Sequence, residues 1–250
     1  VYNGLSQVPS NVTFSNVVYD DVLSPVFNVI GYKNAGTYEI KLVALDGANC
    51  SNYKITNVTY DSFVINKAPL KVVLSDKTIT YGDSEPEYSE LVSFEGFVNG
   101  ETKSVLALVS DAYSEYDTSN VSKRNAGSYE INSPVYESAN YEISYNNSTL
   151  TVNKKIISVS LSSENSSSYY NGSVQIPNFS IEGFAYNDNI ETIKNSLEFS
   201  KELKNAGTYN NVSLTIDHTN YTFTDTNVNY TILPAEIGFS WTISNMVYKG

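Results

Sequence analysis

The sequence predicts an all-β chain of tandem repeats, and three observations lead to this fold class. The phrase Asn-Ala-Gly-Thr/Ser-Tyr occurs three times, at residues 34–38, 125–129 and 205–209. Two further markers keep a constant order around it, because a Tyr-Gly marker precedes each copy and an Asn-Tyr pair follows it. Between the markers, apolar and polar residues alternate with a period of two. A recurring set of markers indicates an array of repeats, and this alternation indicates half-buried strands.

The two further markers divide the chain into repeats of similar length. The first stands at Tyr2-Asn3-Gly4, Tyr81-Gly82, Tyr170-Asn171-Gly172 and Tyr248-Lys249-Gly250. The second stands at Asn52-Tyr53, Asn140-Tyr141 and Asn220-Tyr221. After each Asn-Tyr pair an alternating strand leads into a short polar or proline-containing junction. These junctions place the repeat boundaries near 66/67, 153/154 and 233/234.

The boundaries define the domains that we expect. Residues 1–66 form a first repeat that lacks its opening strand, and residues 67–153 and 154–233 form the second and third repeats. Residues 234–250 are expected to be the opening strand of a truncated fourth repeat. Since the junctions are short and contain no flexible Gly/Ser linker, we expect the repeats to form an elongated, semi-rigid rod.

The repeated phrase places its residues on one side of an extended segment. Asn34, Gly36 and Tyr38 are spaced by two, so they point the same way in a strand. In immunoglobulin-type sandwiches, a Tyr at this spacing bonds its hydroxyl back to the backbone at a corner between the two sheets. We therefore expect Ig-like β-sandwich modules with one tyrosine corner in each repeat. The structural residues of these corners are Asn34, Gly36, Tyr38, Asn125, Gly127, Tyr129, Asn205, Gly207 and Tyr209.

The residues after the corner tyrosine predict how each strand faces the core. Ile40 and Ile131 fall two places after the Tyr, at a position that faces inward. The third repeat has Asn211 at this position, followed by Val212. This order predicts a β-bulge, which returns an apolar side chain to the core.

Helical signal is confined to short stretches. Ile190, Ile193 and Leu197 share one face of a segment of one or two helical turns, at residues 188–197. A turn of the same kind is expected within residues 97–106. A β-grasp repeat is the alternative fold, and a helix lying across one sheet would distinguish it.

The charge balance excludes some classes of partner. The chain has a formal net charge of -12 at pH 7, whereas nucleic acid and anionic membranes attract proteins with a basic face. We expect no nucleic-acid partner and no membrane insertion, because no segment resembles a membrane span or a signal peptide. A hydrophobic content of 41% with 21 Tyr is sufficient for packed cores.

The sequence offers no constellation for catalysis. Cys50 is the single cysteine and His218 the single histidine, and they lie in different repeats. No intrachain disulfide, Cys–His pair or zinc cluster is therefore expected, and we interpret His218 as a solvated loop residue. Carboxylates such as Asp21 and Asp188 look loop-like, and no calcium-ligand spacing supports a calcium site between repeats. We expect no enzyme activity, no metal and no cofactor.

The order of the motifs resembles a known group of repeats. In the second repeat, Tyr81-Gly82-Asp83, the segment Gly96-Phe97-Val98-Asn99-Gly100-Glu101, the Asn-Ala-Gly-Ser-Tyr phrase and Asn140-Tyr141 follow one another, and a Leu-Thr-Val strand closes the series. This order is similar to that of the MBG/YDG-type repeats of bacterial cell-surface adhesins. The first and third repeats carry Tyr-Asn-Gly instead, and the third keeps only Gly183-Phe184 of the middle motif. The resemblance implies extracellular tandem repeats in a stalk or adhesin, a class with some relatives associated with mucus binding.

We therefore expect a non-catalytic, extracellular stalk or adhesin repeat, attached to a bacterial cell surface through parts outside these 250 residues. One alternative is a module that binds glycans or mucin directly. Another is a self-assembling surface filament or surface-layer component, in which residues 236–243 complete the first repeat of the next molecule. The expected partners are host or neighbouring-cell glycans, mucin, surface proteins, or a second copy of the chain bound end to end.

Overall fold

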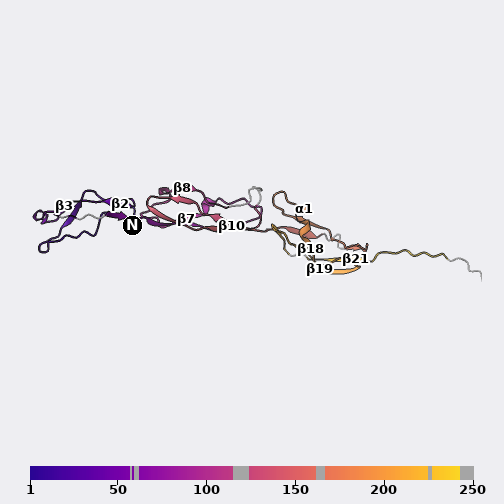
Figure 1. The fold of residues 1–250 in the computed structure, drawn as a ribbon. Coiled ribbons are helices and arrows are strands. Elements are labelled where there is room, and N and C mark those ends of the chain that lie inside the picture. The colour runs from indigo at the N-terminus through magenta and orange to yellow at the C-terminus, as the bar shows by residue number, and fades with distance from the viewer. Residues whose placement is uncertain (57, 59–61, 115–123, 162–166, 225–226, 243–250) are drawn as a thin grey trace, which may run out of the picture. The chain divides into compact units, whose positions relative to one another are not determined.

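The structure is a computed structural model that describes residues 1–250 except 57, 59–61, 115–123, 162–166, 225–226 and 243–250. Strands make up 43% of it, arranged in several small sheets of two to four strands. The predicted all-β class is therefore confirmed. Figure 1 draws the chain as a ribbon. The chain divides into two compact units. Unit 1 comprises Val1–Lys77, Glu85–Tyr116 and Ser128–Leu150, and unit 2 comprises Thr78–Ser84, Asp117–Gly127 and Thr151–Gly250.

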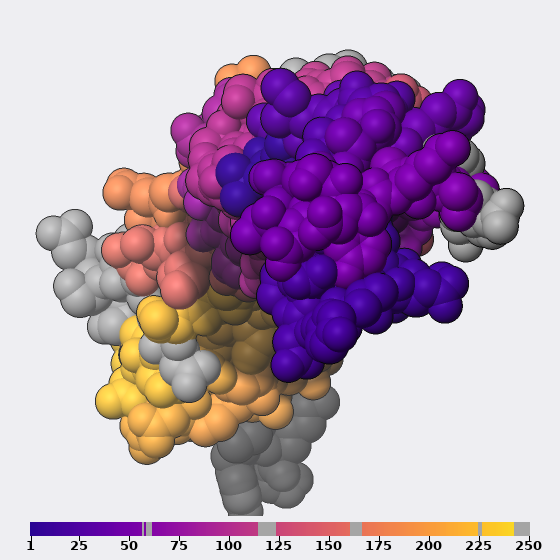
Figure 2. Space-filling model, turned by 90° about the vertical axis from the view of Figure 1, so that its left-hand side faces the viewer, coloured from indigo at the N-terminus to yellow at the C-terminus, as the bar shows by residue number. Residues whose placement is uncertain are grey.

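Unit 1 holds the first repeat and most of the second. Its strands are β1 (Ser24–Phe27), β2 (Gly36–Glu39), β3 (Leu42–Asp46), β4 (Ser62–Ile65), β5 (Ala68–Leu74), β7 (Val92–Glu95), β8 (Ala107–Ser110), β9 (Tyr113–Ser114), β11 (Val135–Glu137) and β12 (Tyr141–Tyr145). Among the described residues of this unit, three 3₁₀ turns accompany them: Cys50–Asn52, Tyr88–Leu91 and Lys103–Val105. The last of these confirms the turn expected within residues 97–106. Figure 2 shows the surface of unit 1 from the side of the first repeat, drawn in indigo to purple.

The opening strand of the second repeat organises the core of unit 1. Every second residue of β5, from Ala68 to Leu74, is buried. The strand pairs in parallel with β12, from Ala68 opposite Tyr141 to Val72 opposite Tyr145, and antiparallel with β7. Alternation of apolar and polar residues predicts a strand but not the direction of its partner, so the sequence did not indicate the parallel pair. In the described part of the first repeat only Tyr2, Ile40 and Ile65 are buried apolar residues, so this repeat is thinly packed.

A four-stranded sheet has the order β6-β13-β10-β9. It contains β6 (Lys77–Thr80), β10 (Gly127–Asn132) and β13 (Ser148–Asn153) together with β9. Its inward side chains include Ile131 and Leu150, both fully buried. The predicted boundary at 153/154 falls directly after β13, and the boundary at 66/67 falls between β4 and β5.

Unit 2 holds the third repeat. Its elements are β14 (Lys155–Ile156), β15 (Ser158–Leu161), β16 (Ser167–Tyr169), β17 (Phe179–Glu182), α1 (Ile190–Ile193), the 3₁₀ turn Lys194–Ser196, β18 (Leu197–Phe199), β19 (Gly207–Ile216), β20 (Tyr221–Thr222) and β21 (Asn227–Leu233). The main sheet has the order β16-β21-β19-β18, and its core contains Leu203, Val212, Tyr230 and Ile232. As in the second repeat, the opening strand β14 pairs in parallel with the strand that starts at the Asn-Tyr tyrosine, β20.

The bulge predicted in the third repeat is present. The register between β19 and β21 shifts between Tyr209 and Val212, and Asn211 adopts a positive φ of 52°. Val212 is fully buried as a result. The extra residue therefore returns an apolar side chain to the core, as the sequence order Asn211-Val212 predicts.

Two further predictions concern the short helix within residues 188–197 and the strand within residues 234–250. The segment predicted to be helical forms α1 and the 3₁₀ turn after it, and Ile193 is fully buried. A four-residue helix spans only about 6 Å and is too short to lie across a sheet, which disfavours the β-grasp alternative.

Residues 234–242 form no strand, and Ile237, Phe239 and Trp241 in this segment are exposed. Residue 243 and those after it lie outside the described residues.

Candidate functional site

The tyrosine of the Tyr-Gly marker joins one repeat to the next. In unit 1, the Tyr2 hydroxyl donates to Oε1 of Glu101 at 2.5 Å, and the Tyr2 ring meets the Tyr141 ring edge to face. In unit 2, the Tyr81 hydroxyl donates to Oδ2 of Asp188 at 2.9 Å, and its ring meets that of Tyr221 in the same way. Tyr2 and Tyr81 are only 3% and 2% exposed. The same contact is thus built twice, once within each unit.

The receiving carboxylate is held by the tyrosine of the Asn-Tyr marker. The Tyr141 hydroxyl accepts from the Val98 amide at 3.1 Å and donates to Oε2 of Glu101 at 2.7 Å. Tyr221 repeats this arrangement with the Ala185 amide at 3.0 Å and Oδ2 of Asp188 at 2.8 Å. Each of these hydroxyls therefore bonds the carboxylate of its own repeat. The same carboxylate accepts the hydrogen bond from the tyrosine of the preceding repeat.

We call the contact between successive repeats a joint. Its first half is the tyrosine–carboxylate contact, and the Asn-Ala-Gly phrase supplies its second half. In unit 1 the Ala35 amide donates to Oδ1 of Asn140 at 2.9 Å, and Nδ2 of Asn140 donates to Oδ1 of Asn34 at 3.2 Å. In unit 2 the Ala126 amide donates to Oδ1 of Asn220 at 2.8 Å, and Nδ2 of that side chain donates to Oδ1 of Asn125 at 2.9 Å. One side-chain amide thus satisfies both a backbone donor and a side-chain acceptor of the preceding repeat.

The glycine of the Tyr-Gly marker allows the repeats to approach closely. A Cβ atom on Gly4 would lie 2.6 Å from Cβ of Asn99, and one on Gly82 would lie 2.5 Å from Cβ of Ala185. Both glycines also have positive φ, 76° and 100°. A residue with a side chain is disfavoured here by contact and by backbone conformation.

Backbone bonds close each joint along the chain. The Tyr2 amide donates to the Asn66 carbonyl at 2.7 Å, and the Ala68 amide donates to the Asn140 carbonyl at 2.9 Å. The equivalent bonds in unit 2 run from the Tyr81 amide to Asn153 and from the Lys155 amide to Asn220. Because the junction is bonded on both sides, little free chain remains between successive repeats.

The joint of unit 1 contains titrating groups whose pKa values depend on it. Burial and the bond to Glu101 raise the pKa of Tyr2 to about 12. The bonds from Tyr2 and then Tyr141 hold the pKa of Glu101 below its ordinary value of 4.5. The contribution of Tyr2 to the unfolding free energy is therefore fully present below about pH 10. This contribution is lost as the pH rises through about 12. The carboxylate stabilises the fold above about pH 4.5, and this part is lost as the pH falls through the lowered pKa.

Tyr2→Phe is accordingly expected to have a pH-dependent effect. The difference in unfolding free energy between the wild-type chain and the variant should stay constant from about pH 6 to 9. It should shrink above about pH 10, where Tyr2 ionises in the unfolded chain, and below about pH 4.5, where Glu101 takes up a proton in the unfolded chain. Chemical denaturation at a series of pH values measures this difference. A difference that does not change with pH would contradict a Tyr2–Glu101 bond.

The predicted corner residues lie next to these joints. The hydroxyls of Tyr38 and Tyr209 donate to the backbone carbonyls of Asn34 and Asn205, both at 2.8 Å. Gly36, Gly127 and Gly207 begin β2, β10 and β19. A Cβ atom on Gly36 would lie 3.0 Å from the Tyr38 hydroxyl. The phrase therefore has two parts. In the first and third repeats its tyrosine bonds back within the repeat, and in the two joints described its Asn-Ala part contacts the next repeat.

Removing a corner hydroxyl is expected to have a modest effect. Tyr38→Phe should lower the unfolding free energy by about 1 kcal/mol, since one hydrogen bond to a partly accessible carbonyl is lost. Tyr32 stacks on Tyr38 with ring centroids 3.9 Å apart, and this packing remains in the variant. Urea denaturation of the two proteins measures the change. An unchanged midpoint would mean that the bond contributes nothing to the corner.

The carboxylates Glu101 and Asp188 are the residues of the joint that the sequence did not reveal. Asp188 looks like a loop residue and Glu101 ends the middle motif of the second repeat, yet each follows the Gly of a Gly-Phe pair, Gly96 or Gly183, by five positions. This shared position is the signal that could have identified them. His218 lies in a loop, as expected, but it is half-buried and its Nδ1 accepts from the Asn220 amide at 3.1 Å.

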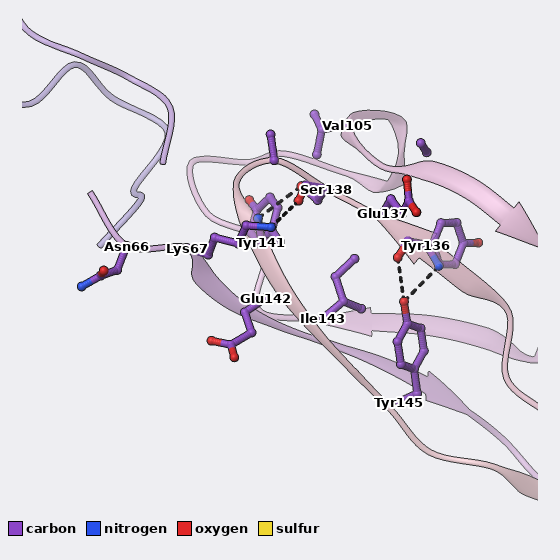
Figure 3. Close-up of a pocket in the computed structure, with 12 residues that line it drawn as sticks. Asn66, Lys67, Val105, Tyr136, Glu137, Ser138, Tyr141, Glu142, Ile143 and Tyr145 are labelled. Atoms are coloured by element: carbon purple, nitrogen blue, oxygen red, sulfur yellow. Dashed lines mark hydrogen bonds between the residues drawn. The ribbon is translucent and has the colours of Figure 1, made fainter. Parts of the chain in front are cut away.

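A separate pocket of about 1190 Å³ lies on the second repeat, open to solvent. Figure 3 shows Asn66 and Lys67 at one end and Tyr136 and Tyr145 at the other. Lys67 donates to the Ser138 carbonyl at 2.7 Å. The Tyr145 hydroxyl accepts from the Tyr136 amide at 3.0 Å and donates to its carbonyl at 2.8 Å, so it closes the backbone edge of β11. Exposed aromatic and carboxylate groups line this pocket, but no catalytic pair does.

The described residues contain neither a metal-binding cluster nor a membrane-spanning helix. Within those residues, no group of three or more His, Cys, Asp and Glu side chains is arranged to hold a metal ion. Nor does any helix there have the length and apolar character needed to cross a membrane.

Comparison with known proteins identifies the second repeat. Residues 70–151 match the family model of the MBG domain, YGX type. The match contains Tyr81-Gly82-Asp83 and Asn140-Tyr141, which supply the joints of units 2 and 1. No curated protein matches the chain. The recognised domain is non-catalytic and is of a type found in bacterial surface proteins. Residues 70–151 of this chain are therefore an MBG domain of the YGX type.

Proposed function

We propose that the chain is a non-catalytic spacer in an extracellular bacterial surface protein, where its repeats project an adhesive part away from the cell. The observation that carries this proposal is the joint, which recurs with the same residue types in both units. In each case a buried tyrosine, a carboxylate and an Asn side chain fix one repeat to the next. A joint fixed by several bonds transmits position and force from one module to the next.

The module itself is proposed to be an Ig-like β-sandwich, with the repeats arranged as a rod. Support comes from the back-bonded tyrosines Tyr38 and Tyr209, and from the three- and four-stranded sheets of the second repeat. The short junctions also support a rod, because only two residues separate Ile65, at the end of β4, from Ala68, at the start of β5. Short connections between packed modules restrict hinge motion.

Distance measurements across one joint test this function. Spin labels attached to cysteines at Val22 and Val109, both exposed in unit 1, are introduced in a Cys50→Ser background. We expect a narrow distance distribution that broadens clearly in Tyr2→Ala. Tyr19→Ala is the matched control, since Tyr19 is 95% exposed and should leave the distribution unchanged. An equally broad distribution in all three proteins would contradict a spacer with fixed joints.

A second candidate function is direct glycan or mucin binding. The observation that favours it is the open pocket, which combines the aromatic ring of Tyr145 with Asn66, Glu137 and Glu142. Aromatic faces and polar groups of this kind are suited to sugar rings. A glycan and mucin array distinguishes the two functions. A spacer predicts no binding, whereas saturable binding that Tyr145→Ala abolishes would favour the pocket.

A further inference from the structure

We propose that the free edge of strand β12 accepts an extended, basic peptide segment of a partner protein as one more strand. The segment would lie in the pocket of the second repeat, between β12 and β11, and would pair its backbone with Ile143 and Tyr145. This interaction goes beyond the spacer function, and it assigns the pocket to a peptide in place of a glycan. It involves residues of unit 1 alone.

Strand β12 is an edge strand, and its free side can be assigned residue by residue. Within the described residues it lies at the end of the sheet order β12-β5-β7. The Ala68 amide donates to the Asn140 carbonyl at 2.9 Å, so residue 140 faces β5. Along a parallel pair, residues that bond the partner strand alternate with residues that face away from it. The odd-numbered residues of β12 therefore direct their amides and carbonyls away from β5; they are Tyr141, Ile143 and Tyr145.

The opposite wall of the pocket is the edge of β11, which pairs with β8 in a two-stranded sheet. The amide and the carbonyl of Tyr136 both bond the Tyr145 hydroxyl, at 3.0 and 2.8 Å, so they face β12. Figure 3 shows the Tyr145 ring between the two strands. Neighbouring strands that pair directly lie about 4.8 Å apart, which leaves no room for such a ring. The two edges are therefore held apart, and the pocket lies between them.

This pocket is suited to an extended chain. Its volume of about 1190 Å³ is larger than that of most small-molecule sites, which measure about 300–1,000 Å³. The Tyr141 amide already accepts a partner in Oγ of Ser138, at 3.2 Å. The backbone groups offered to a partner are therefore those of Ile143 and Tyr145, which both line the pocket. An added strand would pair these groups, whereas an unpaired edge leaves them to water.

The side chains along the edge favour a segment that alternates apolar and basic residues. Ile143 is half-buried and packs against the core of unit 1. Glu137 and Glu142 bring two exposed carboxylates to the pocket. Lys67 also lines it, but its ammonium donates to the Ser138 carbonyl. In a strand beside β12, apolar side chains would lie against Ile143 and lysine or arginine beside Glu142. A second copy of this chain, with its net charge of -12, fits this surface poorly.

Titration of the ¹⁵N-labelled chain with a synthetic peptide tests the proposal. The probe is a seven-residue peptide with blocked ends that alternates lysine and valine. We expect saturable amide shifts at Ile143 and Tyr145 and slower hydrogen exchange of the Ile143 amide. The dissociation constant should be on the order of 1 mM or below, because a short flexible peptide must be ordered on binding. The matched control is the same peptide with methylated backbone nitrogens. It keeps the charge and the side chains but cannot donate to β12, so it should cause no saturable shifts.

Variants of the chain locate the contact. Ile143→Pro removes an amide that faces the pocket but no bond to β5, and it should abolish the saturable shift at Tyr145. Glu142→Gln should weaken binding about two- to fivefold, the effect of one exposed ion pair. Glu95→Gln is the matched control, because Glu95 is exposed on β7, at the other edge of the same sheet, and should leave the affinity unchanged. If the spectrum of Ile143→Pro shows that it is unfolded, the methylated peptide and the two Gln variants decide the outcome.

Absence of shifts up to about 5 mM peptide would overturn the proposal. Equal shifts with the methylated peptide would also overturn it, because charge alone would then attract the probe. Saturable shifts of the same amides with a mucin glycan, but not with the peptide, would assign the pocket to the glycan and reject strand addition. None of these results would affect the spacer function, which depends on the joints within the chain.

Discussion

Gly82→Ala is expected to destabilise unit 2 by about 3 kcal/mol. The new Cβ would lie 2.5 Å from Cβ of Ala185, an atom attached directly to the backbone that no side-chain rotation can move away. The substitution also places a side chain at a φ of 100°. Urea denaturation of the variant and the wild-type chain measures the cost.

Gly172→Ala is the matched control for this prediction. It changes the same marker in the third repeat at a φ of 81°, but the new Cβ would meet no atom within 4 Å. Only the backbone cost remains, so we expect about 1 kcal/mol. Equal costs at the two positions would mean that the approach of Gly82 to Ala185 does not constrain the marker.

Tyr221→Phe is expected to cost about 2–3 kcal/mol. Tyr221 is fully buried, and its hydroxyl accepts from the Ala185 amide and donates to Asp188. Without the hydroxyl, a buried backbone donor loses its partner, and the full desolvation penalty of that group is added to the lost bond. The carboxylate that receives Tyr81 also loses its support, so the joint should weaken together with the repeat.

Tyr53→Phe provides the comparison, because Tyr53 makes the same two bonds in the first repeat. There the tyrosine is only half-buried and the Val18 amide lies near solvent. Water replaces the hydroxyl in the variant, so we expect a clearly smaller loss of unfolding free energy than in Tyr221→Phe. Circular dichroism during urea denaturation measures both variants. A cost at Tyr221 no larger than that at Tyr53 would contradict the role assigned to burial.

Features that depend on neighbouring residues were predictable from the sequence. The corner bond joins residues four places apart, and the bulge at Asn211 involves a single extra residue in one strand. The short helix follows from the spacing of Ile190, Ile193 and Leu197. In each case a local pattern of side chains determines the local backbone, so a single sequence contains the necessary information.

The joints could not be derived in this way, because their partners lie far apart in the chain. Tyr2 and Glu101 are separated by 99 residues, and Tyr81 and Asp188 by 107. The sequence showed that the markers recur, but recurrence alone did not show that the markers of successive repeats meet. The Asn-Ala-Gly phrase was therefore interpreted only as a corner within each repeat, and neither Glu101 nor Asp188 was expected to bond a neighbouring repeat.

The direction of strand pairing could not be predicted from the sequence either. In β5, alternating burial fits a parallel or an antiparallel neighbour equally well, and the parallel pairing with β12 follows from the fold as a whole. Residues 234–242 match the opening strands of other repeats in pattern but form no strand, since a strand needs a partner edge. Pattern alone therefore predicts what a segment can form, and the available neighbours decide whether it does.

The central claim is that a tyrosine of one repeat bonds a carboxylate of the next, and a double-mutant cycle on Tyr2 and Glu101 tests it most directly. The unfolding free energies of the wild-type chain, Tyr2→Phe, Glu101→Gln and the double variant are measured by urea denaturation at neutral pH. We predict a coupling energy of about 1 kcal/mol or more, because the two residues share a charge-assisted bond of 2.5 Å. Effects that add to within about 0.3 kcal/mol would show that the residues act independently and would contradict the joint.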